Sequence, residues 1–301
     1  METAEKLRAS MDAAEDLQSV VTTMKGMAAV NIRQYERAVE SLRDYWQSIE
    51  RGFQVLLRRE PGMLGWGDSM REGGAVFVVF GSDQGMCGRL NSEIAAIALD
   101  ALQAESSGQR KLLVVGGRAA GELEAGGAPP DTVFHVPSSI SELNERVQDV
   151  VLRVERWRAE AGMGRVRLFH NRPRGGASYE PATLSLLPLD LDWLRALAEK
   201  PWPTRCLPGF PVSGSTLFAA LVREYLFAAL YRAFAESLAS ENASRLAAMQ
   251  SAEKNIDERI QGLRMRYHQR RQAAITEELL DVISGFETLA HGKKKHRNEA
   301  S

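Results

Sequence analysis

The sequence predicts a small α/β domain with a mostly parallel sheet, inserted between two long helices that pair as an antiparallel coiled coil. All 11 prolines of the 301-residue chain lie between Pro61 and Pro211, and 19 of the 25 glycines fall in the same interval. Proline interrupts helices because it lacks an amide hydrogen and clashes with the preceding turn. We therefore expect one discontinuous helical shaft over residues 1–60 and 212–290, and an α/β domain over residues 61–211.

The N-terminal segment carries a narrow apolar seam that advances in steps of three and four residues. Its members are Ile32, Tyr35, Val39, Leu42, Trp46, Ile49, Phe53 and Leu56. This spacing, about 3.5 residues per turn, is typical of a coiled coil. A single helix over residues 3–58 would be roughly 80 Å long, which is too long for a helix that forms one side of a small globular domain.

The C-terminal segment has the same pattern, with a seam that runs from Leu246 to Leu289. A helix over residues 215–289 would be roughly 110 Å long. Heptads alone also fit two separate helices in a bundle. The order helix–domain–helix favours pairing of the two ends within one chain, and such a pair is antiparallel.

The middle of the chain alternates short apolar runs with amphipathic stretches. We expect strands over residues 75–80, 111–115, 132–136 and 165–171, and a fifth over 184–189. The fifth is expected at a sheet edge, because Pro188 removes a hydrogen-bond donor. Helices are expected over residues 90–103, 118–123 and about 138–160. Strand and helix alternation of this kind predicts a mostly parallel sheet.

The loop after the first strand reads GSDQGMCG, and its glycine spacing differs from GxGxxG. The chain contains no Gly-Lys-Ser/Thr, GxSxG or HExxH, and its five histidines lack metal-ligand spacing. Cys87 precedes a helix and could be a reactive thiol, although a small residue in a tight turn is the simpler interpretation. Asp83 and Asn91 are interpreted as turn and capping residues. We therefore expect no catalytic residue, cofactor or metal site.

Charge and composition bound the function further. The 38 basic and 39 acidic side chains nearly cancel, which argues against nucleic-acid binding. Two cysteines fit a reducing compartment, and we expect neither a signal peptide nor a membrane span. Residues 259–271 hold five arginines and no acid, whereas acids follow at 277, 278 and 281, a pattern that suits differently charged partners. The basic residues 291–301 are predicted to form a disordered tail.

Three strings, in order along the chain, resemble the gamma subunit of F-type ATP synthases. RQAAITEELLDVISG, from Arg271, is close to a signature of that family. GSDQGMCGRLN, from Gly81, resembles its SxDRGLCGGLN turn, and MKGMAAVNIR, from Met24, resembles its MKMVAAxKxR stretch. Departures such as Gln84 and Arg89 in the turn suggest a divergent member, such as one from an alternate F-type ATPase. The resemblance spans nearly the whole chain and implies the same architecture that proline and heptad spacing predict.

The resemblance also implies a function. It implies a central-stalk rotor that couples ion translocation to ATP synthesis or hydrolysis and is not an enzyme by itself. The implied partners are the alpha, beta and epsilon subunits and the membrane ring of c subunits, at the cytoplasmic side of a cell inner membrane. Positional match implies these contacts with the beta subunit: Met24, Lys25, Arg245, Arg271, Gln272, Thr276 and Glu278. Two alternatives remain, namely a nucleotide-binding enzyme built on the middle domain and a free-standing coiled-coil scaffold.

Overall fold

The computed structural model describes residues 3–65, 73–105, 108–175 and 178–298, with side chains up to Ser284. It contains two compact units, one made of residues 1–25 and 249–301 and the other of residues 26–248. Helices α1 (Ala4–Arg59) and α7 (Gly214–Asn298) contribute to both units. Within the second unit, parts of α1 and α7 share one core with the sheet.

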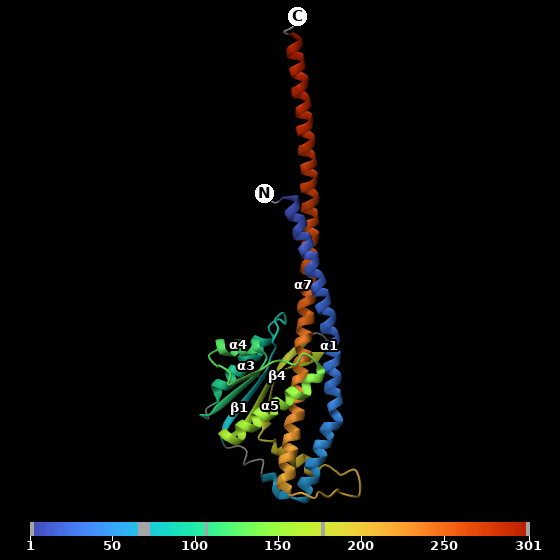
Figure 1. Ribbon diagram of the computed structural model, residues 1–301. Helices are drawn as coiled ribbons and strands as arrows, with labels where there is room; N and C mark the ends of the chain where they lie inside the picture. The colour runs from blue at the N-terminus through green and yellow to red at the C-terminus, as the bar shows by residue number, and fades with distance from the viewer. Residues whose placement is uncertain (1–2, 66–72, 106–107, 176–177, 299–301) are drawn as a thin grey trace. The chain divides into compact units, whose positions relative to one another are not determined.

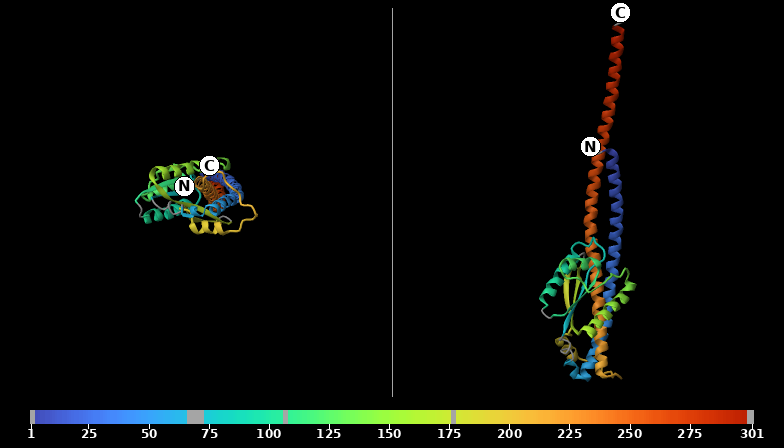
Figure 2. Two further views of the ribbon diagram at one scale, coloured as in Figure 1. Left: turned by 90° about the horizontal axis from the view of Figure 1, so that it is seen from below. Right: turned by 60° about the vertical axis from the view of Figure 1, so that its left-hand side comes forward.

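The two long helices are present and run antiparallel, side by side, as expected (Figures 1 and 2). Helix α7 continues to Asn298, whereas the sequence predicted a disordered tail from residue 291. No proline interrupts this run, and its three lysines and one arginine are good helix formers that offset the cost of Gly292.

The second unit contains a five-stranded sheet with the order β3-β2-β1-β4-β5. The strands are β1 (Gly74–Phe80), β2 (Arg110–Val115), β3 (Thr132–Phe134), β4 (Met163–Gly175) and β5 (Ser178–Leu187). The first four are mutually parallel where they pair, and β5 runs antiparallel to β4 at the edge. The expected edge strand is therefore present, but it begins at Ser178 and ends before Pro188.

Strand β1 is buried along its whole length, because its side chains feed two different cores. Val76, Val78 and Phe80 join the core that includes α5 (Ile140–Ala161) and parts of α1 and α7. The alternate residues 75, 77 and 79 join the core beneath α3 (Leu90–Ala104) and α4 (Gly117–Ala125). Figure 1 shows α3 and α4 on one side of the sheet and α5, α1 and α7 on the other. A strand that is covered by helices on both faces consists of a continuous run of apolar residues, which is why the sequence AVFVVF predicts a buried strand here.

Aromatic rings join the long helices to the rest of the second unit. Phe234 of α7 meets Phe80 of β1 edge to face, with ring centroids 4.5 Å apart. Phe53 of α1 packs on Phe218 of α7 and on Trp193, at 6.0 and 5.7 Å. Trp193 belongs to α6 (Leu191–Glu199), a short helix that was not predicted from the sequence and that follows the cap residue Asp190. The 3-10 helix η1 (Pro61–Gly65) was also not foreseen.

In the first unit, α1 and α7 bury a small set of apolar side chains: Leu7, Val21, Met249, Ile256, Ile260 and Leu263. Polar links flank this seam, including an ion pair of 2.8 Å between Arg264 and Glu15. Within this unit α7 extends past the start of α1 (Figures 1 and 2). Among the described helices, none is long and apolar enough to cross a membrane.

Candidate functional site

The loop between β1 and α3 is a tightly hydrogen-bonded turn. The side chain of buried Asn91 accepts a hydrogen bond from the amide of Ser82 at 2.9 Å and donates one to its hydroxyl at 2.8 Å. Asp83 accepts from the amides of Gly117 and Val136, at 2.7 and 2.8 Å. Both side chains therefore support the turn, in keeping with the structural interpretation of Asp83 and Asn91.

Glycine is required in this turn for steric reasons. A Cβ on Gly81 would lie 2.3 Å from the Cβ of Ala119 and 2.7 Å from the Asn91 side chain. Arg89, which replaces a glycine of the resembled motif, has a φ of −96° and a largely exposed side chain, so any residue fits there. Cys87 is buried beside Ser82 and Asn91, consistent with a small residue that fills the turn.

The turn is fixed to α7 by two residues of that helix. The Ser244 hydroxyl donates to the carbonyl oxygen of Cys87 at 2.6 Å. Arg245 pairs with Glu241 at 2.7 Å and donates to the carbonyl oxygen of Gly85 at 3.5 Å. Burial raises the pKa of Glu241, and the neighbouring Arg245 only partly offsets this. Arg245 is 8% exposed, so the structure places this predicted contact residue in the interior rather than on a surface.

These contacts belong to a longer stretch of α7 that is enclosed on all sides. Residues 233–245 are all buried, although seven of them are polar. Glu236 lies 2.9 Å from Nε2 of His170 on β4 and 2.7 Å from Nε of Arg232. Burial disfavours the charged carboxylate, but the bonds from His170 and Arg232 outweigh it, so the pKa of Glu236 lies below its ordinary value. Neither His170 nor Glu236 is among the residues predicted from the sequence, and the apolar seam predicted for this helix begins only at Leu246.

The opposite situation holds further along the same helix. Residues 268–284 of α7 are all exposed. Five of them are large and apolar, each about half exposed or more: Ile275, Leu279, Leu280, Val282 and Ile283. A helix that is left with such a surface usually has a partner that covers it.

Four predicted contact residues lie on this exposed stretch. At 100° per residue, Gln272 and Thr276 fall among the apolar side chains, whereas Arg271 and Glu278, seven residues apart, lie together at one margin. The Thr276 hydroxyl donates to the carbonyl oxygen of Gln272 at 2.9 Å. The structure therefore brings these four together on one helix segment, as polar groups interspersed with an apolar surface.

Met24 and Lys25 lie on α1 in the first unit, and both are partly buried. The Lys25 ammonium pairs with Glu253 of α7 at 2.6 Å. Glu253 precedes Arg271 by 18 residues, or about 27 Å along a helix, so the two predicted contact groups are not adjacent. Lys25 is thus engaged within the chain and only a third of its side chain faces solvent.

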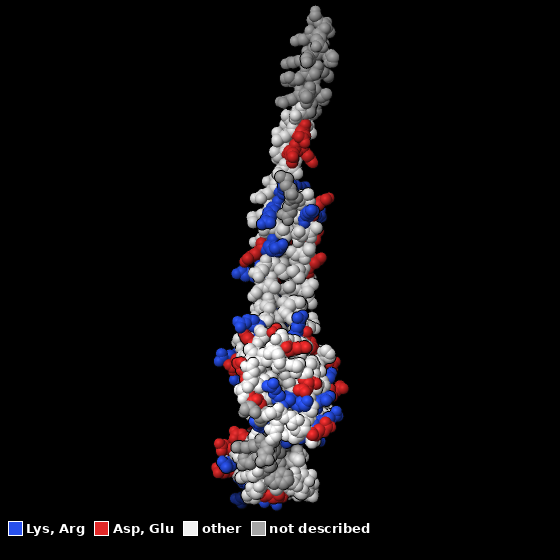
Figure 3. Space-filling model, turned by 90° about the vertical axis from the view of Figure 1, so that its left-hand side faces the viewer, with Lys and Arg blue, Asp and Glu red and all other residues white. Residues whose placement is uncertain are grey.

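The exposed stretch also carries a local charge. Glu277, Glu278 and Asp281 are exposed and acidic, and they follow the arginine-rich residues 259–271. Figure 3 shows acidic side chains gathered near the end of the described part of α7. Among the described residues, no group of three or more His, Cys, Asp or Glu side chains could hold a metal.

Comparison with known proteins identifies the family. A family model described as "ATP synthase" matches residues 3–289. The ATP synthase gamma chain of Methylibium petroleiphilum is 27% identical over 95% of this chain and 98% of its own length. That of Nitrosospira multiformis is 26% identical over 93% of this chain and 97% of its own length.

Solved structures share the fold. A chain of the Euglena gracilis mitochondrial ATP synthase, from a structure of OSCP, F1 and the c-ring, has a TM-score of 0.65 and 18% identity, covering 97% of this chain and 96% of that one. A chain of the Tetrahymena thermophila central stalk and c-ring has a TM-score of 0.55 and 22% identity over 77% of this chain and 99% of that one. The chain therefore belongs to the ATP synthase family, with gamma chains among its relatives.

Proposed function

We propose that this subunit is the rotor that couples ion translocation through a membrane ring to ATP synthesis or hydrolysis in a head of alpha and beta subunits. The observation that carries the proposal is the exposed stretch 268–284 of α7, whose apolar side chains are uncovered in the isolated chain. A ring of alternating alpha and beta subunits around this helix would remove that apolar surface from water. Hydrophobic burial of this kind is the main driving force of most protein association.

In the proposed mechanism the subunit performs no chemistry itself. A helix with acidic residues 277, 278 and 281 on one side and apolar side chains on the other is asymmetric about its axis. As such a helix turns, it offers each surrounding subunit a different surface in succession. Differential contacts of this sort can favour different nucleotide affinities in otherwise identical sites. Catalytic residues would belong to the surrounding subunits.

The remaining partners and the location are part of the same proposal. The second unit would bind the epsilon subunit and the c-ring, at the cytoplasmic side of a cell inner membrane. The gamma-chain relatives and the assemblies named in the similar structures support this assignment.

For contacts with the beta subunit we propose Arg271, Gln272, Thr276 and Glu278, together with Met24 and Lys25. Arg245 would reach a partner only by leaving its buried pair with Glu241. Breaking such a pair leaves an uncompensated buried charge. We therefore propose that Arg245 contributes least to beta-subunit binding among these residues.

The test is a double variant, Arg271→Ala with Gln272→Ala, in the complete complex. Each removed hydrogen bond to a charged group is worth about 1.5–3 kcal/mol, so coupled ATP synthesis should fall about tenfold or more, with less alpha and beta recovered. The measurements are ATP synthesis by membrane vesicles and co-purification with alpha and beta subunits.

A matched control uses Arg259→Ala with Gln261→Ala, which removes the same side-chain types from exposed positions of the same helix outside residues 268–284. The control should retain coupling and assembly. Normal coupling in the Arg271 and Gln272 variant would refute these contacts. Failure of the unaltered chain to co-purify with alpha and beta subunits would refute the rotor and favour a free-standing scaffold.

A further inference from the structure

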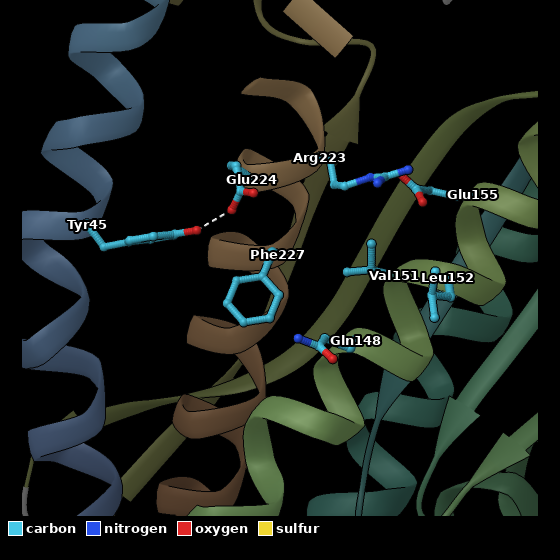
Figure 4. Close-up of a pocket in the computed structure, with 8 residues that line it drawn as sticks. All are labelled: Tyr45, Gln148, Val151, Leu152, Glu155, Arg223, Glu224 and Phe227. Atoms are coloured by element: carbon cyan, nitrogen blue, oxygen red, sulfur yellow. Dashed lines mark hydrogen bonds and ion pairs between the residues drawn. The ribbon is translucent and has the colours of Figure 1, made fainter. Parts of the chain in front are cut away.

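Some polar links of α7 in the second unit are made at the protein surface. Figure 4 shows two of them, in which Tyr45 donates to Glu224 and Arg223 pairs with Glu155 at 2.7 Å. Tyr45 is 38% exposed and the Arg223 side chain 62%, so water completes whatever these groups do not bond within the chain.

Glu241 and Arg245 differ, because they form a buried ion pair that leaves polar atoms of both side chains unmatched. They are 6% and 8% exposed, and one bond of 2.7 Å joins Nη2 of Arg245 to Oε1 of Glu241. Oε2 of Glu241 and Nε of Arg245 are buried and have no hydrogen-bond partner among the described residues. Arginine and carboxylate groups commonly form two parallel bonds. This pair is therefore held together by fewer bonds than its chemistry allows.

The surroundings of the pair oppose the negative charge of Glu241. Burial raises the pKa of Glu241, Arg245 offsets this only in part, and repulsion by Asp83 of the turn between β1 and α3 adds to it. On α1 the neighbour is buried Tyr35, whose own pKa is raised by burial and then by Glu241 and by Glu142 of α5. Tyr35 is thus neutral and supplies no positive charge to Glu241.

Asp83 is already engaged by the backbone and by a surface histidine. Its Oδ1 accepts the amide of Gly117 at 2.7 Å and its Oδ2 that of Val136 at 2.8 Å. The largely exposed His135 lies 3.4 Å from the same Oδ2 atom. Among the described residues, the carboxylate that bonds Arg245 is that of Glu241. The charge of Arg245 therefore depends on the ionised form of Glu241.

Arg245 also reaches the edge of the protein. Its Nη2 atom donates to the carbonyl oxygen of Gly85 at 3.5 Å, which is long for such a bond. Gly85 lies between the exposed residues Gln84 and Met86, and a Cβ at Gly85 would be 3.8 Å from Nη2 of Arg118 on α4. Two guanidinium groups thus flank this part of the turn. An arginine can keep its aliphatic stem packed while its charged head moves into water.

We propose that a proton and Arg245 compete for the carboxylate of Glu241. A proton taken up from solvent at Oε2 neutralises Glu241 and leaves Arg245 as a buried charge without a counter-ion. Such an uncompensated charge is strongly destabilising in a protein interior, so the guanidinium moves outward past Gly85. There it binds a carboxylate of a surrounding alpha or beta subunit, a step that rests on the proposed function. Contact between Arg245 and its partner therefore strengthens as the pH falls.

The test measures the reaction of Arg245 with phenylglyoxal in the isolated chain, by mass spectrometry of its peptides. Exposed Arg266 is the internal reference for the reagent. Because the pKa of Glu241 is raised above the ordinary value of about 4.3, the reaction is followed between roughly pH 5 and pH 9. Relative to Arg266, Arg245 should react about fivefold faster or more at the lower end than at the upper end. An equal ratio across this range would overturn the proposal.

Variants of two buried glutamates of α7 sharpen this test. Glu241→Gln, a neutral isostere, should give the fast ratio at every pH. The matched control Glu236→Gln neutralises a carboxylate that is paired with His170 and Arg232, and should keep the pH dependence of the unaltered chain. A slow ratio in the first variant, or a fast ratio at every pH in the second, would contradict competition at Glu241. Thermal unfolding identifies a variant that fails to fold, and the unaltered chain then decides from its pH dependence alone.

The complete complex tests the partner carboxylate. There the increase at low pH should be much smaller than in the isolated chain, because the partner covers the released guanidinium. An increase of the same size would overturn the partner contact. Absence of alpha and beta subunits from the purified sample would refute the proposed function, whereas the competition measured in the isolated chain would stand.

Discussion

Two stretches of the same helix α7 reverse the usual relation between polarity and burial. Residues 233–245 are all buried although seven of the 13 are polar, whereas residues 268–284 are all exposed although five are large and apolar. In the first stretch, polar groups such as Glu236 and Ser244 find partners within this chain. In the second, the apolar groups have no such cover. The first stretch is therefore covered within the isolated chain, although Ser237 Oγ, Glu241 Oε2 and Arg245 Nε have no hydrogen-bond partner in the described part of it, whereas the apolar side chains of the second stretch face solvent.

The largest expected difference concerns core packing. Phe234→Ala in the buried stretch removes a ring that is 1% exposed and meets Phe80 at 4.5 Å. It should lower the free energy of unfolding by about 3–5 kcal/mol. Leu280→Ala in the exposed stretch should change it by less than about 0.5 kcal/mol. Denaturant unfolding of both isolated chains measures this, and similar losses would show that residues 268–284 are covered in solution.

The pH dependence of stability should reveal the buried charge at Glu236. Because its pKa is lowered in the folded chain, its contribution is present above the ordinary glutamate pKa of about 4.3 and is lost as the pH falls through the folded value. Glu236→Gln should cost about 1–3 kcal/mol at pH 7 and should remove that part of the acid destabilisation. Unfolding curves between pH 3 and pH 7, at roughly half-unit steps, measure both effects.

An unchanged acid profile in Glu236→Gln would contradict the assigned role of this carboxylate. Glu278→Gln, in the exposed stretch, is the matched control. It should leave both the stability and its acid profile unchanged, since Glu278 is exposed.

A smaller effect is expected where the buried stretch holds the turn between β1 and α3. Ser244→Ala removes the hydrogen bond to the Cys87 carbonyl and should cost about 0.5–1.5 kcal/mol. Ser48→Ala, at an exposed position where the hydroxyl bonds only to the Asp44 carbonyl of its own helix, is the control and should be nearly neutral. Hydrogen exchange at the turn amides should also accelerate in Ser244→Ala alone. Equal exchange in both variants would mean that Ser244 does not restrain the turn.

The smallest effect concerns the ion pair of Lys25 and Glu253, whose side chains are about 30% exposed. A double-mutant cycle with alanine at both positions should give a coupling energy of about 0.2–1 kcal/mol, decreasing in high salt. The more exposed pair Arg264 and Glu15 should give less. A coupling above about 2 kcal/mol would show that Lys25 is held far more rigidly than its exposure implies.

The regular parts of the fold were predictable because local sequence determines them. The run AVFVVF predicted β1 almost to the residue, and the proline-free ends with their heptads predicted α1 and α7. The short helix α6 was not foreseen, since nine residues next to a proline-rich segment give little periodicity. The length of β5 was underestimated, because Pro181 is tolerated at the sheet edge.

The candidate site was only partly predictable for a physical reason. The residues of the exposed stretch could be named from a local string, since they lie within two turns of one helix. The interior position of Arg245 could not, because it depends on the turn at Gly85, which is 160 residues distant in sequence. The same holds for His170 and Glu236, which are 66 residues apart. The burial of polar residues in a helix depends on which elements pack against it. The sequence of the helix alone does not indicate which of its polar residues will be buried.

The contact between Phe53 and Phe218 has a consequence for the synthesis of the protein on the ribosome. Phe218, the partner of Phe53 on α7, is synthesised only about 165 residues later, which takes roughly 8–30 s at 5–20 residues per second. During that interval the apolar seam of α1 is without its main cover, and contacts this distant in sequence form slowly. Newly made chains should therefore pass through a stage in which the apolar seam of α1 is exposed and prone to aggregation. Their yield should depend on holdase chaperones more than on the final stability of the folded protein.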